Sequence, residues 1–157
     1  MDGDRLKDKL EGIVRPVVES LGFELWGMEF LSGGRGGLLR VFIESPQGIS
    51  ISHCKEVSKH LDVVLDVEDP IPGPYTLEVS SPGMERRFFH IHQLPPYLGK
   101  MMALRTREAV EGRKRWRGRL CAVREEVEEL VLDVEGEERV FSWNEIETIN
   151  LLYWVEA

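Results

Sequence analysis

Hydrophobic residues in the first half of the chain recur twice with the period of an amphipathic α-helix. The first stripe predicts one helix, which Pro16 kinks rather than divides and which Gly22 ends. The second stripe predicts a helix that Ser52 caps and that three prolines between residues 70 and 74 end. The stripes consist of Leu6, Leu10, Ile13, Val14, Val17, Val18 and Leu21, and of Cys54, Val57, Leu61, Val64 and Leu65.

Three segments of the same half, residues 23–31, 38–44 and 75–79, have the aromatic, β-branched and alternating composition of strands. The glycines between the first two contain the GxxG spacing of KH-type RNA-binding loops. That loop joins two helices in KH domains, so a hairpin turn with Arg35 at its tip is the better interpretation. The order α-β-β-α-β predicts two helices that cover one face of a three-stranded sheet.

Helical periodicity disappears after the proline pair at residues 95–96. Many short strands in a short segment favour a small β-barrel, because closure removes unpaired strand edges. We therefore predict an α+β protein with an N-terminal α/β domain at residues 1–93 and a C-terminal five-stranded barrel at residues 94–157. The predicted strands of the barrel are residues 100–106, 113–123, 127–135 and 139–143, and a last one near 149–155.

Charge is distributed unevenly along the chain. The net charge is −8, which argues against a protein that coats nucleic acid without specificity, because phosphate repels it. Residues 99–124 nevertheless carry 9 basic and 2 acidic groups, whereas residues 125–157 carry 1 basic and 11 acidic groups. A basic block followed directly by an acidic block needs an explanation.

The strongest basic signal is a run of alternate arginines, with Lys114 among them. A spacing of two places all four arginines on one face of a strand, where they could contact phosphate. The alternative is that they pair with the acidic block inside the fold, which a tight turn near residues 124–126 would allow. The arginines are Arg113, Arg115, Arg117 and Arg119, and the alternative pairs Arg117 with Asp133, Arg115 with Glu135 and Arg113 with Glu137.

Signals for catalysis, metals and membranes are weak. Four histidines and two distant cysteines form no HExxH or CxxC motif, and no phosphate-binding or nucleophile motif is present. We therefore expect no enzyme, no cofactor and no metal site, and two buried cysteines; an enzyme with an unrecognised concave site is the remaining alternative. No apolar run reaches membrane-spanning length and no export signal is evident, so we expect a cytosolic protein without membrane contact.

Residues 75–83 read Tyr-Thr-Leu-Glu-Val-Ser-Ser-Pro-Gly and are followed by Met-Glu-Arg. Together with the preceding helix, the Asp-Pro-Ile at residues 69–71 and the Gly-Arg-Lys-Arg-Trp-Arg-Gly at residues 112–118, this segment resembles the ribosome maturation factor RimP family. The resemblance covers nearly the whole chain in order. It implies an α/β domain followed by an Sm-like or SH3-like barrel, and a bacterial origin.

The resemblance also implies a non-enzymatic assembly factor that acts in ribosome biogenesis. We expect a monomer, because the exposed stacking aromatics of an Sm-type ring cannot be placed in this sequence. Its partner would be the free or immature 30S subunit, through 16S rRNA and small-subunit proteins near the decoding region. Where the family usually has Asp-Arg-Pro-Leu, this chain has Glu85-Arg86-Arg87-Phe88, which adds a positive charge. The expected contact residues are Arg86, Arg87, Arg113, Lys114, Arg115, Arg117 and Arg119.

An Sm-type module that binds small RNAs is the alternative function. It predicts an oligomeric ring and affinity for naked RNA, and the net charge of −8 counts against it.

Overall fold

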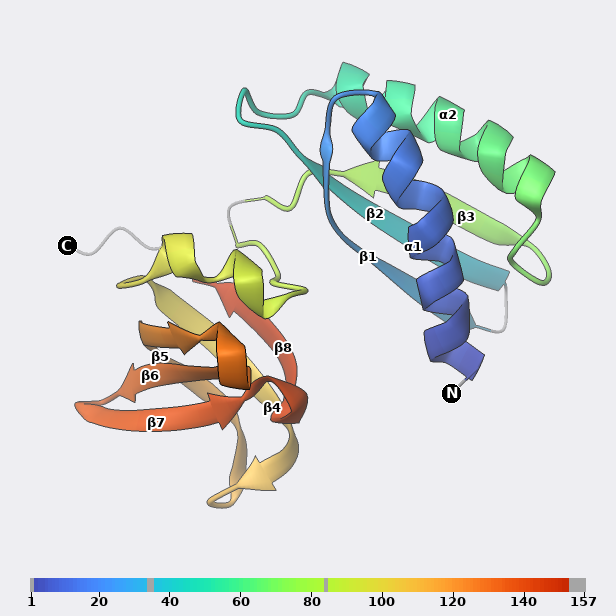
Figure 1. The fold of residues 1–157 in the computed structure, drawn as a ribbon. Coiled ribbons are helices and arrows are strands. Elements are labelled where there is room, and N and C mark those ends of the chain that lie inside the picture. The colour runs from blue at the N-terminus through green and yellow to red at the C-terminus, as the bar shows by residue number, and fades with distance from the viewer. Residues whose placement is uncertain (1, 34–35, 84, 153–157) are drawn as a thin grey trace. The chain divides into compact units, whose positions relative to one another are not determined.

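The computed structural model describes residues 2–33, 36–83 and 85–152. The chain forms two compact units, one from Met1 to Pro82 and one from Gly83 to Ala157 (Figure 1). We refer to them as unit 1 and unit 2.

Unit 1 has the predicted α-β-β-α-β order. Its elements are α1 (Asp2–Ser20), β1 (Glu24–Gly33), β2 (Gly36–Glu44), α2 (Ile51–Glu68) and β3 (Tyr75–Ser80). The sheet order is β1-β2-β3, with β1 antiparallel and β3 parallel to β2. A parallel pair needs a crossover connection, which α2 supplies, so α2 packs beside α1 on one face of the sheet (Figure 1).

The core of unit 1 comes from the predicted stripes. Alternate residues of β2 are fully buried against the helices, because side chains of a strand point to opposite faces in turn. The buried residues are Leu10, Val14 and Val18 of α1, Val57, Leu61 and Leu65 of α2, and Leu25, Met28, Leu39, Val41, Ile43 and Ile71 of the sheet and loops. The sequence therefore identified the faces that pack.

Two details of the helices bear on the predictions. Helix α1 continues through Pro16, as predicted. Helix α2 is capped by Ser50 and not by the predicted Ser52: the Ser50 hydroxyl accepts a hydrogen bond of 3.2 Å from the backbone N–H of His53. His53 Nδ1 in turn accepts from the backbone N–H of Ser50 at 3.1 Å, so the cap is reciprocal and fixes the start of the helix two residues earlier. Arg35 lies outside the described residues.

Unit 2 is a five-stranded antiparallel sheet in the order β7-β6-β5-β4-β8. In this order the last strand of the unit pairs with its first strand. Its strands are β4 (Met101–Val110), β5 (Arg113–Arg124), β6 (Glu129–Val134), β7 (Glu137–Ser142) and β8 (Ile146–Leu151). Short 3-10 turns, η1 (Ile91–Gln93), η2 (Pro95–Tyr97), η3 (Glu125–Val127) and η4 (Trp143–Glu145), lie before and between the strands. Strand β8 begins earlier than the predicted residue 149, and residues 153–155 lie outside the described part of the chain.

The units divide at Pro82–Gly83, whereas the proline pair suggested a boundary between residues 93 and 94. Residues that follow Gly83 pack with unit 2: the backbone N–H of Phe88 donates to the carbonyl of Ile149 at 2.9 Å, and the Phe88 ring is buried edge-on against Tyr97. A proline pair marks where helical periodicity ends, but it does not show with which side the preceding segment packs.

Candidate nucleic-acid interface

Strand β5 presents the predicted arginine face. From Arg115 to Leu120, exposed and buried residues alternate without exception, so Arg115, Arg117 and Arg119 lie on the outer side. On the inner side the Trp116 ring packs edge-on against Phe141 at 5.4 Å between centroids. This packing fixes which side of β5 faces solvent.

Gly118 allows β5 to approach β6 closely. A Cβ atom at this position would lie 2.7 Å from the carbonyl oxygen of Asp133 and 3.0 Å from a methyl group of Val134. Backbone on one side leaves no room for a side chain, so the glycine is required by the packing of the two strands.

Arg113 differs from the other arginines. Its guanidinium carbon lies 3.7 Å from the centroid of the Trp116 ring, a cation–π contact. The neighbouring Lys114 is exposed. The four arginines therefore do not form one uniform row: one stacks on the core tryptophan and three point outward.

The predicted register between β5 and β6 is wrong. Arg119, and not Arg117, lies opposite Asp133, and Leu120 lies opposite Leu132. The pairing is displaced by two residues, which keeps every side chain on its predicted face, and a bulge between Leu120 and Ala122 shifts it further. The bulge and the wide turn through η3 set this register, and neither is encoded in the alternation of residues.

The bulge also explains why Cys121 is exposed, although it was expected to be buried. Cys121 is exposed and its thiol donates to the Arg119 carbonyl at 3.4 Å, whereas burial was expected. Cys54 is half-buried on α2.

The basic residues of β5 differ in their partners, and Arg124 at the end of the strand lies 3.7 Å from a carboxylate oxygen of Glu129. Among the described residues, Arg115 and Lys114 form no ion pair with a carboxylate and donate no side-chain hydrogen bond. Arg119 donates to the carbonyl of Gly99 at 2.5 Å. The expected partner Glu137 pairs instead with Arg139, at 3.1 Å. The internal pairing of Arg113 and Arg115 with Glu137 and Glu135 is therefore not formed.

Strand β4 extends the basic surface. Arg105 lies directly opposite Arg115, so two like charges face each other across the strand pair. Arg105 forms an exposed ion pair with Glu147 at 3.1 Å. We call the outward-facing Arg105, Arg115, Arg117 and Arg119 the arginine face. Arg105 was not among the predicted contact residues, although its alternation with buried Leu104 places it on the exposed face of β4.

The segment that contains Arg86 and Arg87 joins the same sheet. Arg87 bridges to Asn150 of β8, and the backbone N–H of Leu151 donates to the Arg86 carbonyl at 2.9 Å. Both side chains are half-buried, with the Arg87 guanidinium 4.9 Å from the Phe89 ring centroid. The structure thus brings the two predicted basic regions into one unit.

Register places Arg87 and the arginine face on one side of the sheet. Arg117 pairs with Ala103, Ala103 pairs with Asn150, and Asn150 bridges to Arg87. Directly paired residues point to the same side, and three strand steps span about 14 Å. Two basic residues therefore flank small side chains in a single row.

A pocket of about 550 Å³ lies in this row. Its lining includes Ala103, Arg105, Arg115, Arg117 and Asn150. Long basic side chains around small ones produce the depression, which no pattern within one strand indicates. We call it the arginine pocket.

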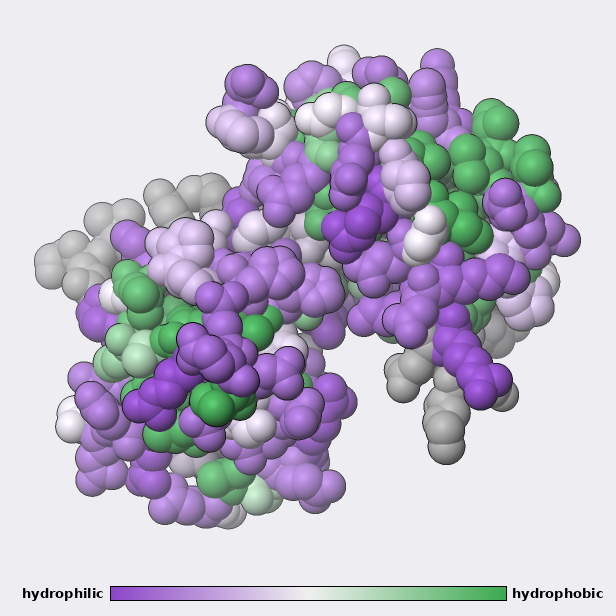
Figure 2. Space-filling model, viewed as in Figure 1, coloured by the Kyte–Doolittle hydropathy of each residue, from purple (hydrophilic) through white to green (hydrophobic). Residues whose placement is uncertain are grey.

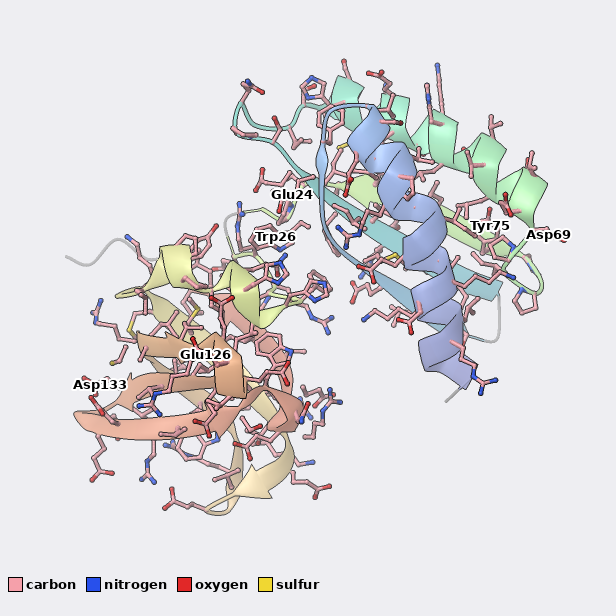
Figure 3. The ribbon with its side chains drawn as sticks, in the orientation of Figure 1. Glu24, Trp26, Asp69, Tyr75, Glu126 and Asp133 are labelled. Carbon is pink, nitrogen blue, oxygen red and sulfur yellow. The ribbon has the colours of Figure 1, made fainter. Side chains whose placement is uncertain are left out.

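Unit 1 offers a surface of opposite charge. Four carboxylates lie at the C-terminal end of α2, where no basic residue occupies the last turn: Asp62, Asp66, Glu68 and Asp69. Figure 3 shows Asp69 and Tyr75 together at this end of the unit. Burial raises the pKa of Tyr75 above its usual 10.0, and the nearby Asp66, Asp62 and Asp69 raise it further.

Exposed apolar residues accompany these acids. Val63 and Val67 of α2 are 65% and 78% exposed, and Figure 2 shows hydrophobic residues gathered on this side of unit 1. A pocket of about 490 Å³ between the two helices is lined by Val17, Val63 and Val64 among others. We call the exposed side of α2 from Asp62 to Asp69 the acidic face.

The described residues contain no group of three or more His, Cys, Asp or Glu side chains that could hold a metal ion. No helix in the described part of the chain is long and apolar enough to cross a membrane.

A comparison with protein families agrees with the resemblance of the sequence motifs. Residues 13–85 match the family model described as the RimP N-terminal domain, so the match covers most of unit 1 and extends to the start of unit 2. The β-rich unit 2 that follows is the second domain that this family leads one to expect. Residues 13–85 therefore carry the N-terminal domain of the RimP family of ribosome maturation factors.

Proposed function

We propose that this protein binds the free 30S subunit in the bacterial cytoplasm and assists its late maturation as a monomer, without catalysing a reaction. The observation that carries the proposal is the arginine face: its four arginines are exposed, and among the described residues Arg115 forms no ion pair with a carboxylate. A cationic surface on a protein of net charge −8 is suited to a local contact with rRNA phosphate.

The acidic face of unit 1 supports the same proposal, because it suits the protein component of the subunit. A ribosomal subunit presents phosphate and also basic proteins, and carboxylates beside exposed valines suit a basic, partly apolar protein segment. Two surfaces of opposite sign allow one acidic protein to contact both components. Its effect on maturation is limited to its difference in affinity between the immature and mature conformations.

The Sm-like strand order favours a second candidate, a module that binds small RNAs. That function requires an oligomeric ring and high affinity for naked RNA. The 30S proposal requires a monomer that binds the free subunit more tightly than the complete ribosome.

Co-sedimentation with purified free 30S subunits, beside complete ribosomes and at rising salt, tests the proposal. We expect saturable binding to free subunits that weakens with salt. Arg115→Glu should weaken it about tenfold, because a contact to phosphate becomes repulsive. Lys7→Glu is the matched control, since it makes the same charge change on an exposed position of α1 in unit 1. Absence of binding at low salt would refute the proposal and favour the small-RNA module.

A further inference from the structure

We propose that the arginine pocket holds one nucleotide of single-stranded RNA, whose flanking phosphates lie on the arginine face. This inference rests on the proposed function, since it names the form of RNA that the same surface takes.

The shape of the pocket carries the first step. Ala103 and Thr148 are short, and each lies beside an arginine in the sheet register: Ala103 beside Arg117, and Thr148 beside Arg105. The space of about 550 Å³ above them is within the range of small-ligand sites. Such a depression accommodates an unstacked base, whereas a duplex would contact only the arginines around it.

The charge around the pocket carries the second step. Arg105, Arg113, Arg115 and Arg117 line it, against a single carboxylate, Glu135. Arginine binds phosphate through paired donors and stacks on bases through its flat guanidinium. Four such groups around one small pocket therefore suit a nucleotide with its neighbouring phosphates.

Uncharged polar groups carry the third step. The amide of Asn150 and the hydroxyl of Thr148 also line the pocket. Such groups can donate to and accept from the edges of an unpaired base, which charged groups alone would not require. The Asn150 amide makes only a long contact of 3.4 Å to the Glu85 carbonyl.

The buried tryptophan of β5 carries an unsatisfied donor beside the pocket. Trp116 lines the pocket, and only 2% of it is exposed. Its indole N–H has no hydrogen-bond acceptor among the described residues. An unsatisfied buried donor costs about 1–3 kcal/mol, and such donors are few in native proteins.

An acidic protein segment is the other anion that this surface could attract. It would be held by charge alone, and neither the small floor nor the amide and hydroxyl groups would contribute. The observations therefore favour RNA.

The test measures binding of fluorescent oligoadenylate and oligouridylate to the full chain, beside an RNA duplex with the same number of phosphates. We expect the single strands to bind about tenfold more tightly than the duplex. A tenfold difference in affinity corresponds to the binding free energy of about one stacked base. Ala103→Leu fills the pocket from the outer face and should lower single-strand affinity about tenfold without changing duplex affinity. Ala109→Leu is the matched control, because Ala109 is exposed on the same strand and does not line the pocket.

A second variant covers the case that Ala103→Leu does not fold. Asn150→Ala changes no charge, so it should lower single-strand affinity and leave the salt dependence unchanged. Arg115→Ala should lower the slope of log K against log salt by about 0.7.

Equal affinity for duplex and single strand, or displacement of the oligonucleotide by oligoglutamate at equal charge, would overturn the inference. The proposed function is tested separately. If Ala103→Leu binds 30S subunits normally and its affinity for single-stranded oligonucleotides is also unchanged, only the pocket inference is lost. If the unsubstituted chain binds no subunit, the proposed function is lost.

Discussion

Replacing Arg115 by glutamate should have opposite effects on stability and on binding. Arg115 lies directly opposite Arg105, and two like charges facing each other across a strand pair are destabilising. Unit charges about 5.5 Å apart interact by about 0.75 kcal/mol in water, with repulsion in the natural protein and attraction in the variant. We therefore expect Arg115→Glu to stabilise unit 2 by about 0.5–1.5 kcal/mol at low salt, while binding to 30S subunits weakens.

The surroundings reduce this gain without reversing its sign. Arg105 already pairs with Glu147 at 3.1 Å, which offsets part of the repulsion. Glu135 lines the same pocket and would repel a glutamate at position 115, but Arg113 and Arg117 line it as well. The variant carboxylate would therefore face more positive than negative charge.

Amide hydrogen exchange of β4 and β5 is the appropriate assay, because it reports unit 2 without contribution from unit 1. The expected gain corresponds to about two- to tenfold slower exchange for amides that open with the whole unit. High salt should abolish the gain, since the Debye length falls to about 3 Å at 1 M. Arg115→Gln should show about half of the effect, and Lys7→Glu none.

Loss of stability in Arg115→Glu at low salt would refute this reasoning. It would show that Arg115 pairs with an acidic side chain of unit 2, which is the internal pairing that the sequence left open. Unchanged stability together with unchanged binding would remove Arg115 from the interface.

Three further outcomes follow from the contacts. Gly118→Ala should destabilise unit 2 by about 1–3 kcal/mol, measured by the same exchange, because its Cβ would lie 2.7 Å from a β6 carbonyl oxygen. Asp66→Asn should lower the raised pKa of Tyr75 in an ultraviolet titration; because that phenol holds its proton more tightly when folded, unit 1 should lose stability only as the pH rises above about 10. A thiol reagent at neutral pH should modify exposed Cys121 before Cys54, whose pKa burial raises; equal rates would contradict this order.

Local patterns of the sequence identified much of this fold. The stripes of α1 and α2 predicted which sides of the helices are buried, and alternation predicted that Arg115 and Arg117 face away from Trp116. These predictions hold because the periods of 3.6 and 2 are properties of the helix and strand themselves. Sequence motifs also indicated the RimP family, whose N-terminal domain matches residues 13–85.

Contacts between segments that lie far apart in the sequence could not be predicted in the same way. The helix cap at Ser50 depends on a histidine side chain folding back, and the boundary at Pro82–Gly83 depends on Phe88 packing into unit 2. Neither feature follows from composition, because each depends on which of several possible partners a side chain contacts in the folded protein.

By itself, the sequence determined the elements, their buried faces and the presence of a basic strand. The tertiary structure decided that Arg119 rather than Arg117 faces Asp133, and that Arg87 and Arg117 lie in one row with Ala103 and Asn150 between them. Side-chain alternation repeats every two residues, so it is satisfied equally well by registers that differ by two. Bulges, turn lengths and the close approach that Gly118 permits select among them, and only that selection forms the pocket.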